Sequence, residues 1–106
     1  MAASRIDFFR MMLESDPDNT AVLFGLAKEY EKAERFDEEI EVLAEYLQRA
    51  DDEGNAYGML AGAYMRLGNR EAARKAYERG IEAASAHNHP SMAEDFRMMI
   101  ETEFDD

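Results

Sequence analysis

The sequence predicts an all-α fold of about five antiparallel helices. Apolar residues between Tyr57 and Ser85 recur with the alternating three- and four-residue spacing of amphipathic helices, on both sides of a Leu67-Gly68-Asn69 turn. The same pattern returns when the chain is compared with itself after a shift of 34 residues, which places Tyr30 on Tyr64. Hydrophobic residues make up 46% of the chain and only two of 106 residues are proline, so one helical domain over residues 1–106 can form a core.

The first expected element is a helix over residues 4–15, which ends at Asp16-Pro17. The 34-residue shift places Phe9 on Leu43, so this helix corresponds to the second helix of a repeat whose first helix is missing. One of its apolar stripes, made of Ile6, Phe9 and Leu13, can pack on the next helix. The other has no covering helix and is a candidate dimer interface, made of Phe8, Met11 and Met12. The alternative is that the helix tilts and buries both stripes itself.

Residues 18–51 form the first expected repeat, with helices over about 20–32 and 37–49. The inward stripe of its second helix is predicted to be Ile40, Leu43, Ala44 and Leu47. Residues 54–85 form the second repeat, in which Gly68 suits the left-handed position after a helix and Asn69 suits the next N-cap. A final helix over 91–104, with Ser91 and Glu94 as a capping box, is expected to close the last apolar face.

The second repeat contains a characteristic series of residues, namely Tyr57, Leu60, Ala61, Tyr64, Gly68, Ala73 and Tyr77. With the 34-residue period, this series makes the chain resemble the tetratricopeptide repeat family over residues 16–85. The first copy departs from the family at Glu39 and Tyr46, where small residues are usual, so a looser helix crossing is expected there. The resemblance implies a short right-handed solenoid of a half repeat, two full repeats and a capping helix.

In this family the first helices of successive repeats line a concave groove that binds peptides or helices. The resemblance therefore implies a groove made of Phe24, Lys28, Lys32, Asn55, Gly58, Met59, Gly62, Met65 and Arg66. Its three cations could pair with an acidic partner, or only with neighbouring surface acids. The two glycines could admit the backbone of a partner, and tight packing within the domain is the alternative explanation for them.

The formal charge of −12 argues against a nucleic-acid or anionic-membrane partner, because 24 acidic residues outnumber 12 basic ones. The chain has no cysteine, nucleophile motif or glycine-rich phosphate loop, so we expect no enzymatic activity, no cofactor and no metal. The N-terminus does not resemble a signal peptide, so a cytoplasmic location is expected. The high acidic content with only three lysines could reflect a salt-rich cytoplasm, or only an ordinary solvated helical surface. Two functions remain: a peptide-binding or helix-binding module, and a structural homodimer assembled through the N-terminal helix.

Overall fold

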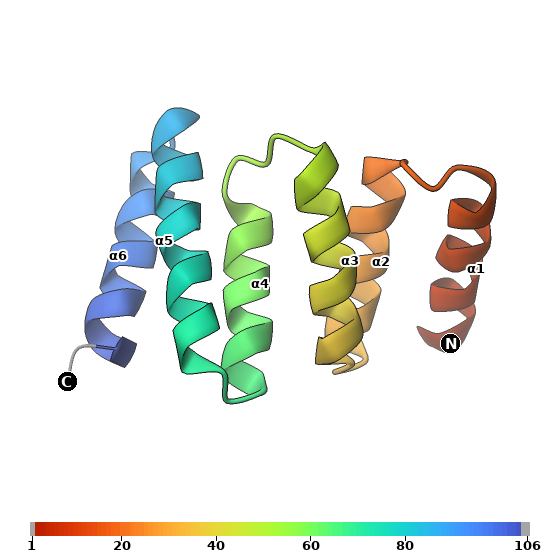
Figure 1. Cartoon of the computed structure of the whole chain (residues 1–106), viewed down its shortest axis with the longest axis horizontal. Helices are drawn as coiled ribbons and strands as arrows, with labels where there is room; N and C mark the ends of the chain where they lie inside the picture. Colours follow the sequence, from red (N-terminus) through yellow and green to blue (C-terminus); the bar gives the residue numbers. More distant parts are fainter. Residues whose placement is uncertain (1, 105–106) are drawn as a thin grey trace. The chain divides into compact units, whose positions relative to one another are not determined.

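The computed structural model describes residues 2–104, with side chains from Arg5 onward, and the described residues are helical with no strand (Figure 1). The all-α prediction is confirmed. The predicted number of about five helices is too low, because a half repeat, two repeats and a capping helix together need six. The helices are α1 (Ala2–Ser15), α2 (Thr20–Lys32), α3 (Phe36–Arg49), α4 (Asn55–Arg66), α5 (Arg70–Ala86) and α6 (Pro90–Phe104). They form two compact units, residues 1–51 and 52–106.

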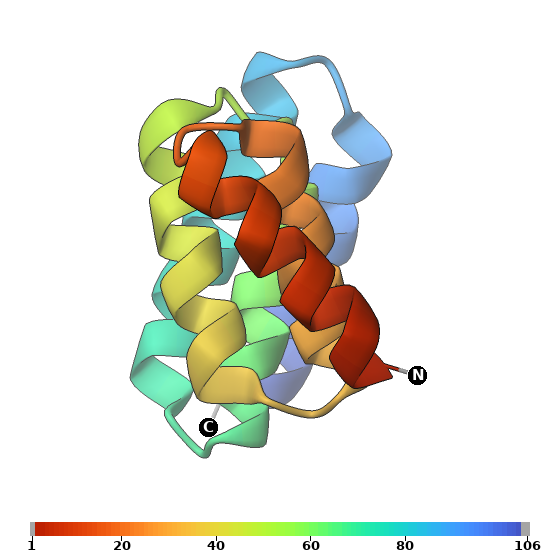
Figure 2. The ribbon, with the colours of Figure 1, turned by 90° about the vertical axis from the view of Figure 1, so that its right-hand side faces the viewer.

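In the first unit, α2 packs against both α1 and α3 (Figure 2). Ile6, Leu26 and Tyr30 form its buried core, and the partly buried Phe9 and Leu13 pack against this core. The helix α1 therefore buries the stripe that contains Ile6 and leaves the other stripe in solvent. Phe8 is 59% exposed, Met11 is 64% exposed and Met12 is 38% exposed. The alternative in which α1 buries both of its stripes is wrong.

The inward face of α3 differs from the predicted stripe at one position. Leu43 is fully buried and Ile40 is half-buried, but Ala44 is exposed. The fully buried neighbour of Leu43 on this face is Glu39, the residue that corresponds to the fully buried Ala73 in the second repeat. The small-residue position of the repeat is therefore buried in both copies, and in the first copy it contains a carboxylate.

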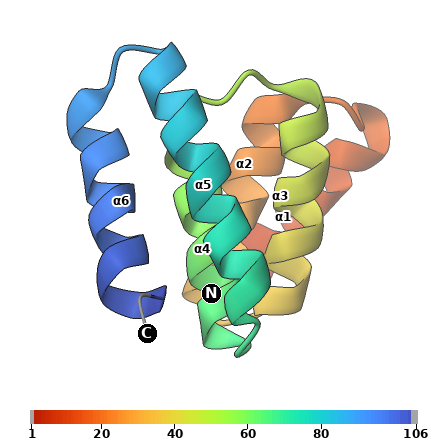
Figure 3. The same ribbon diagram turned by 60° about the vertical axis from the view of Figure 1, so that its left-hand side comes forward.

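In the second unit, α5 packs against both α4 and α6 (Figure 3). The predicted turn between α4 and α5 is confirmed, since Gly68 has a φ of 78° and the Asn69 side chain accepts a hydrogen bond from the Ala72 amide at 3.2 Å. The capping box at the last helix is wrong. That helix begins at Pro90, so Ser91 lies inside its first turn rather than at the N-cap, which is consistent with the preference of proline for the first helical position.

Small residues on α4 and α5 leave space for an aromatic side chain of α6. A Cβ atom added to Gly80 would lie 2.8 Å from the Phe96 ring, and one added to Gly58 would lie 3.1 Å from it. The Phe96 ring also lies 5.7 Å from the ring of Tyr77, measured between centroids. Phe96 therefore fills a slot between α4 and α5, and this contact holds α6 in place.

Candidate functional site

The groove residues predicted in the first unit, Phe24, Lys28 and Lys32, all lie on α2, and all three contact other side chains of the chain. The ammonium group of Lys28 lies 5.0 Å from the centroid of the Phe24 ring, which in turn lies 5.1 Å from the Tyr46 ring. The ammonium group of Lys32 lies 3.4 Å from a carboxylate oxygen of the buried Glu29. Lys28 forms no ion pair among the side chains of residues 5–104, so it is the freer of the two lysines.

The groove residues predicted in the second unit all lie on α4, and its two glycines differ in their surroundings. Gly58 lies under the Phe96 ring, so its missing side chain leaves room for packing within the unit. A Cβ atom at Gly62 would have nothing within 4 Å, so that position faces open space. Met59 and Met65 are half-buried, and Arg66 is exposed at the end of the helix. Of the two glycines, Gly62 alone leaves room for an approaching partner.

A cavity of about 530 Å³ lies between α4 and α6, with one residue from α5. Its lining residues are Asn55, Gly58, Tyr77, Met92, Asp95, Phe96 and Met99. Four of these side chains are apolar or aromatic, and the volume falls within the range of about 300–1,000 Å³ typical of ligand pockets. The cavity brings together two predicted groove residues, Asn55 and Gly58, while Met59, Gly62, Met65 and Arg66 do not line it.

The part of this cavity that α6 supplies is not predicted by the sequence. From the sequence, the last helix is expected only to close the last apolar face, whereas in the structure its Met92, Phe96 and Met99 line the cavity. The signal that could have revealed them is the pair of glycines in the second repeat, Gly58 and Gly80, which leaves a slot that neither α4 nor α5 fills. A large aromatic side chain on the next helix is the natural complement of such a slot.

The polar groups of the cavity are unpaired. Asp95 is exposed at its edge, and neither its carboxylate nor the carboxamide of Asn55 has a hydrogen bond or ion pair within the described residues. No cation lines the cavity. Nearby arginines are engaged elsewhere: Arg97 lies 3.3 Å from Glu94, and the Arg79 guanidinium lies 5.6 Å from the centroid of the Tyr57 ring. The cavity is thus an apolar hollow with an unneutralised carboxylate at its edge.

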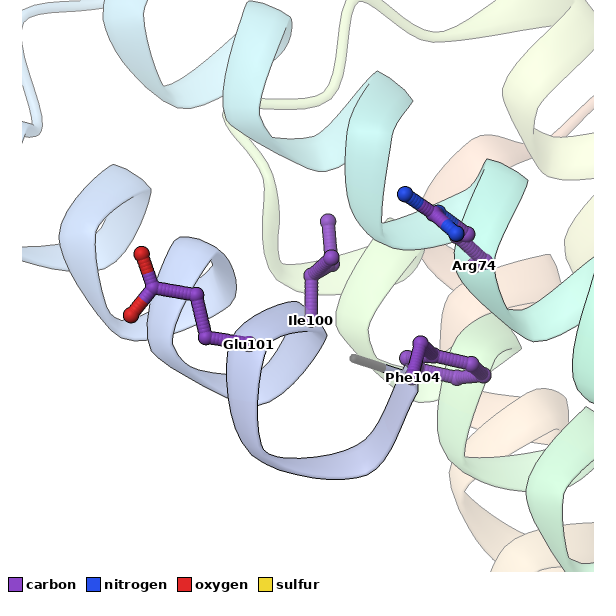
Figure 4. Close-up of a pocket in the computed structure, with 4 residues that line it drawn as sticks. All are labelled: Arg74, Ile100, Glu101 and Phe104. Carbon is purple, nitrogen blue, oxygen red and sulfur yellow. The ribbon is translucent and has the colours of Figure 1, made fainter. Parts of the chain in front are cut away.

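A second hollow, of about 290 Å³, lies between α5 and the end of α6 and is shown in Figure 4. Arg74, Ile100, Glu101 and Phe104 line it, and the Glu101 side chain points away from the other three (Figure 4). The guanidinium of Arg74 lies 3.7 Å from Glu78, so its charge is already compensated. This hollow is smaller and has fewer apolar walls than the cavity between α4 and α6, which makes it the weaker candidate.

Two groups of the described structure have perturbed acid–base properties through burial. Burial raises the pKa of Glu39 to about 7, with the Glu31 carboxylate as a second cause. Burial also raises the pKa of Tyr77, and the Glu103 carboxylate adds to this effect. Glu39 does not line either hollow, and residues 5–104 contain no group of three metal-ligating side chains. Glu39 and Tyr77 therefore do not share a hollow, as the acid and base of a catalytic pair would.

Residues 54–87 match the tetratricopeptide repeat among known protein families. The matched segment covers α4, α5 and the turn between them, together with Gly54 before α4 and His87 after α5. Among curated proteins, none matches the chain. No helix in the described part of the chain is long and apolar enough to cross a membrane.

Proposed function

We propose that the chain is a member of the tetratricopeptide repeat family, which residues 54–87 match, and that it binds a peptide or a helix of another protein on the exposed face of α4, with the exposed face of α2 as a second binding surface. Tetratricopeptide repeats are typically non-catalytic modules for protein–protein interaction. The observation that supports the proposal most strongly is the apolar cavity beside α4, whose polar groups have no partner within the described residues. On α2, Phe24 and Lys28 offer an aromatic ring and a cation without a carboxylate partner, a surface suited to an acidic group.

A substitution at Gly62 tests the α4 surface without disturbing the fold. Gly62→Arg adds a long side chain where nothing lies within 4 Å, and it replaces a glycine inside a helix, so the protein should be as stable as wild type or slightly more stable. Ala44→Arg is the matched control, because it adds the same side chain and charge at an exposed position of α3. Affinity capture from lysate of the source cell should recover a protein with wild type and with Ala44→Arg, but not with Gly62→Arg.

Equal recovery by the two variants would contradict binding on the α4 face, and recovery of nothing by wild type would contradict the proposed function. The acidic-partner hypothesis for α2 has its own variant, Lys28→Glu. This change leaves the buried Glu29 and its ion pair with Lys32 in place. Loss of the captured protein in Lys28→Glu, with an unchanged melting temperature, would support an acidic group on the partner.

A second candidate function is a structural homodimer formed through α1. The observation that favours it is the continuous apolar surface of Phe8, Met11 and Met12, because exposed stripes of this kind commonly mark an interface. Light scattering at high micromolar concentration should give a dimer mass for wild type and a monomer mass for Met11→Glu. Met98→Glu is the control, since it places the same charge on another exposed methionine, on α6. A monomer mass for wild type would rule out this candidate.

A further inference from the structure

We propose that the cavity between α4 and α6 receives an apolar side chain of a partner segment that carries a lysine or arginine about one helical turn away, and that this cation pairs with Asp95. The inference rests on the proposed function, because it names the chemistry of the partner for one part of the proposed surface. It assigns α6 a role in recognition in addition to its role in closing the core.

The apolar part of the cavity is already formed in the unbound chain. Phe96 is held by its contacts with Gly58 and Gly80 and by the neighbouring Tyr77 ring, so this wall does not have to reorganise when a ligand enters. Met92 and Met99 complete the walls with flexible thioether side chains that adapt to ligands of different shape. A leucine, methionine or phenylalanine side chain would therefore lose its hydration in the cavity without a large rearrangement of the protein.

The charges around the cavity favour a basic partner over an acidic one. Asp95 has no counterion in the described structure, and the other lining residues are uncharged. An acidic segment would bring a second negative charge next to Asp95, in a chain with a formal charge of −12. A lysine or arginine would neutralise Asp95, and the overall negative charge would increase its rate of association. The unpaired carboxamide of Asn55 could accept or donate one further hydrogen bond at the edge of the same cavity.

Two synthetic peptides test this preference directly. They are helical, of equal length and equal apolar content, with a leucine followed four residues later by arginine in one peptide and by glutamate in the other. Nuclear magnetic resonance titration with the full chain should show the arginine peptide shifting the amide signals of Gly58 and Phe96. The arginine peptide should bind at least about tenfold more tightly than the glutamate peptide, and its affinity should fall with added salt.

Substitution of Asp95 separates the ion pair from the apolar contact. Asp95→Asn should weaken the arginine peptide by about threefold, as expected for an exposed ion pair. Asp95→Lys should reverse the preference and make the glutamate peptide the tighter ligand. Because Asp95 is exposed, both variants should fold as wild type does. Glu94→Gln is the matched control, since Glu94 is paired with Arg97 and does not line the cavity, and it should leave both affinities unchanged.

Three results would each overturn the inference: equal affinities of the two peptides, amide signal changes only at residues other than Gly58 and Phe96, and an unchanged peptide preference in Asp95→Lys. Absence of binding by either peptide would overturn it as well. The proposed function would survive these results if Gly62→Arg still abolished capture of a cellular protein. In the reverse case, the arginine peptide binds more tightly than the glutamate peptide, but no cellular protein is captured in a way that depends on Gly62. That result would contradict the proposed function and leave the cavity as a site for basic apolar peptides.

Discussion

Glu39 gives the sharpest prediction about the stability of the protein. Its side chain is 0% exposed, and both carboxylate oxygens are buried without a hydrogen-bond partner in the described residues. An isolated charge at such a position is disfavoured, because the interior solvates it poorly. Burial therefore raises the pKa of Glu39 from 4.5 to about 7, and the nearby Glu31 carboxylate adds to the effect.

The raised pKa means that the folded state binds the Glu39 proton more tightly than the unfolded state does. Below about pH 4.5 the carboxyl group is neutral in both states and does not lower stability. As the pH rises from 4.5 to about 7, the unfolded state ionises while the folded state must still keep the proton, so the free energy of unfolding falls. Above about pH 7 the full effect is reached, about 3 kcal/mol for this difference in pKa.

Urea unfolding at two pH values measures this contribution. Glu39→Gln has nearly the same shape but cannot ionise, so its stability relative to wild type should rise by about 2 kcal/mol between about pH 5.5 and pH 8. Glu41→Gln is the matched control, since it removes a carboxylate from an exposed position of the same helix and should show almost no change. The reasoning is refuted if the stability difference between wild type and Glu39→Gln is the same at both pH values.

Two further predictions concern the slot that Phe96 fills. Gly80→Ala should lower the free energy of unfolding by about 1–3 kcal/mol, because its Cβ would lie 2.8 Å from the Phe96 ring and 3.1 Å from the Tyr57 Cβ. Gly62→Ala, at a position with open space around it, should instead raise the free energy of unfolding by about 1 kcal/mol. Thermal unfolding that showed a change of the same sign for both variants would contradict this packing. Phe96→Ala should destabilise the protein by about 3 kcal/mol and speed amide hydrogen exchange in α6, while unchanged exchange there would show that other contacts hold this helix.

The helical nature of the chain could be predicted because its signals are local. The 34-residue period indicates two repeats, of which the second matches the tetratricopeptide repeat over residues 54–87. Gly68 and Asn69 mark the turn of this repeat through backbone conformation and capping. The predicted capping box is wrong because the last helix begins at Pro90, two residues earlier than an N-cap at Ser91 requires. The burial of Glu39 was not predicted, since a charged residue next to Leu43 would ordinarily be expected to face solvent.

The candidate site could not be predicted because it depends on a contact between residues far apart in the sequence. The 34-residue shift places Phe24 on Gly58 and Tyr46 on Gly80. In the first repeat the two aromatic rings of Phe24 and Tyr46 fill this position, whereas the two glycines of the second repeat leave it open. Read along the sequence alone, Gly58 could equally well admit a partner. In the folded chain Phe96 enters the space the two glycines leave, which accounts for Gly58 and Gly80 by packing and brings α6 beside α4. The cavity in the second unit is therefore shared between a repeat helix and the last helix. Its charged lining residue is Asp95, which lies outside the repeat residues that the family resemblance implicates.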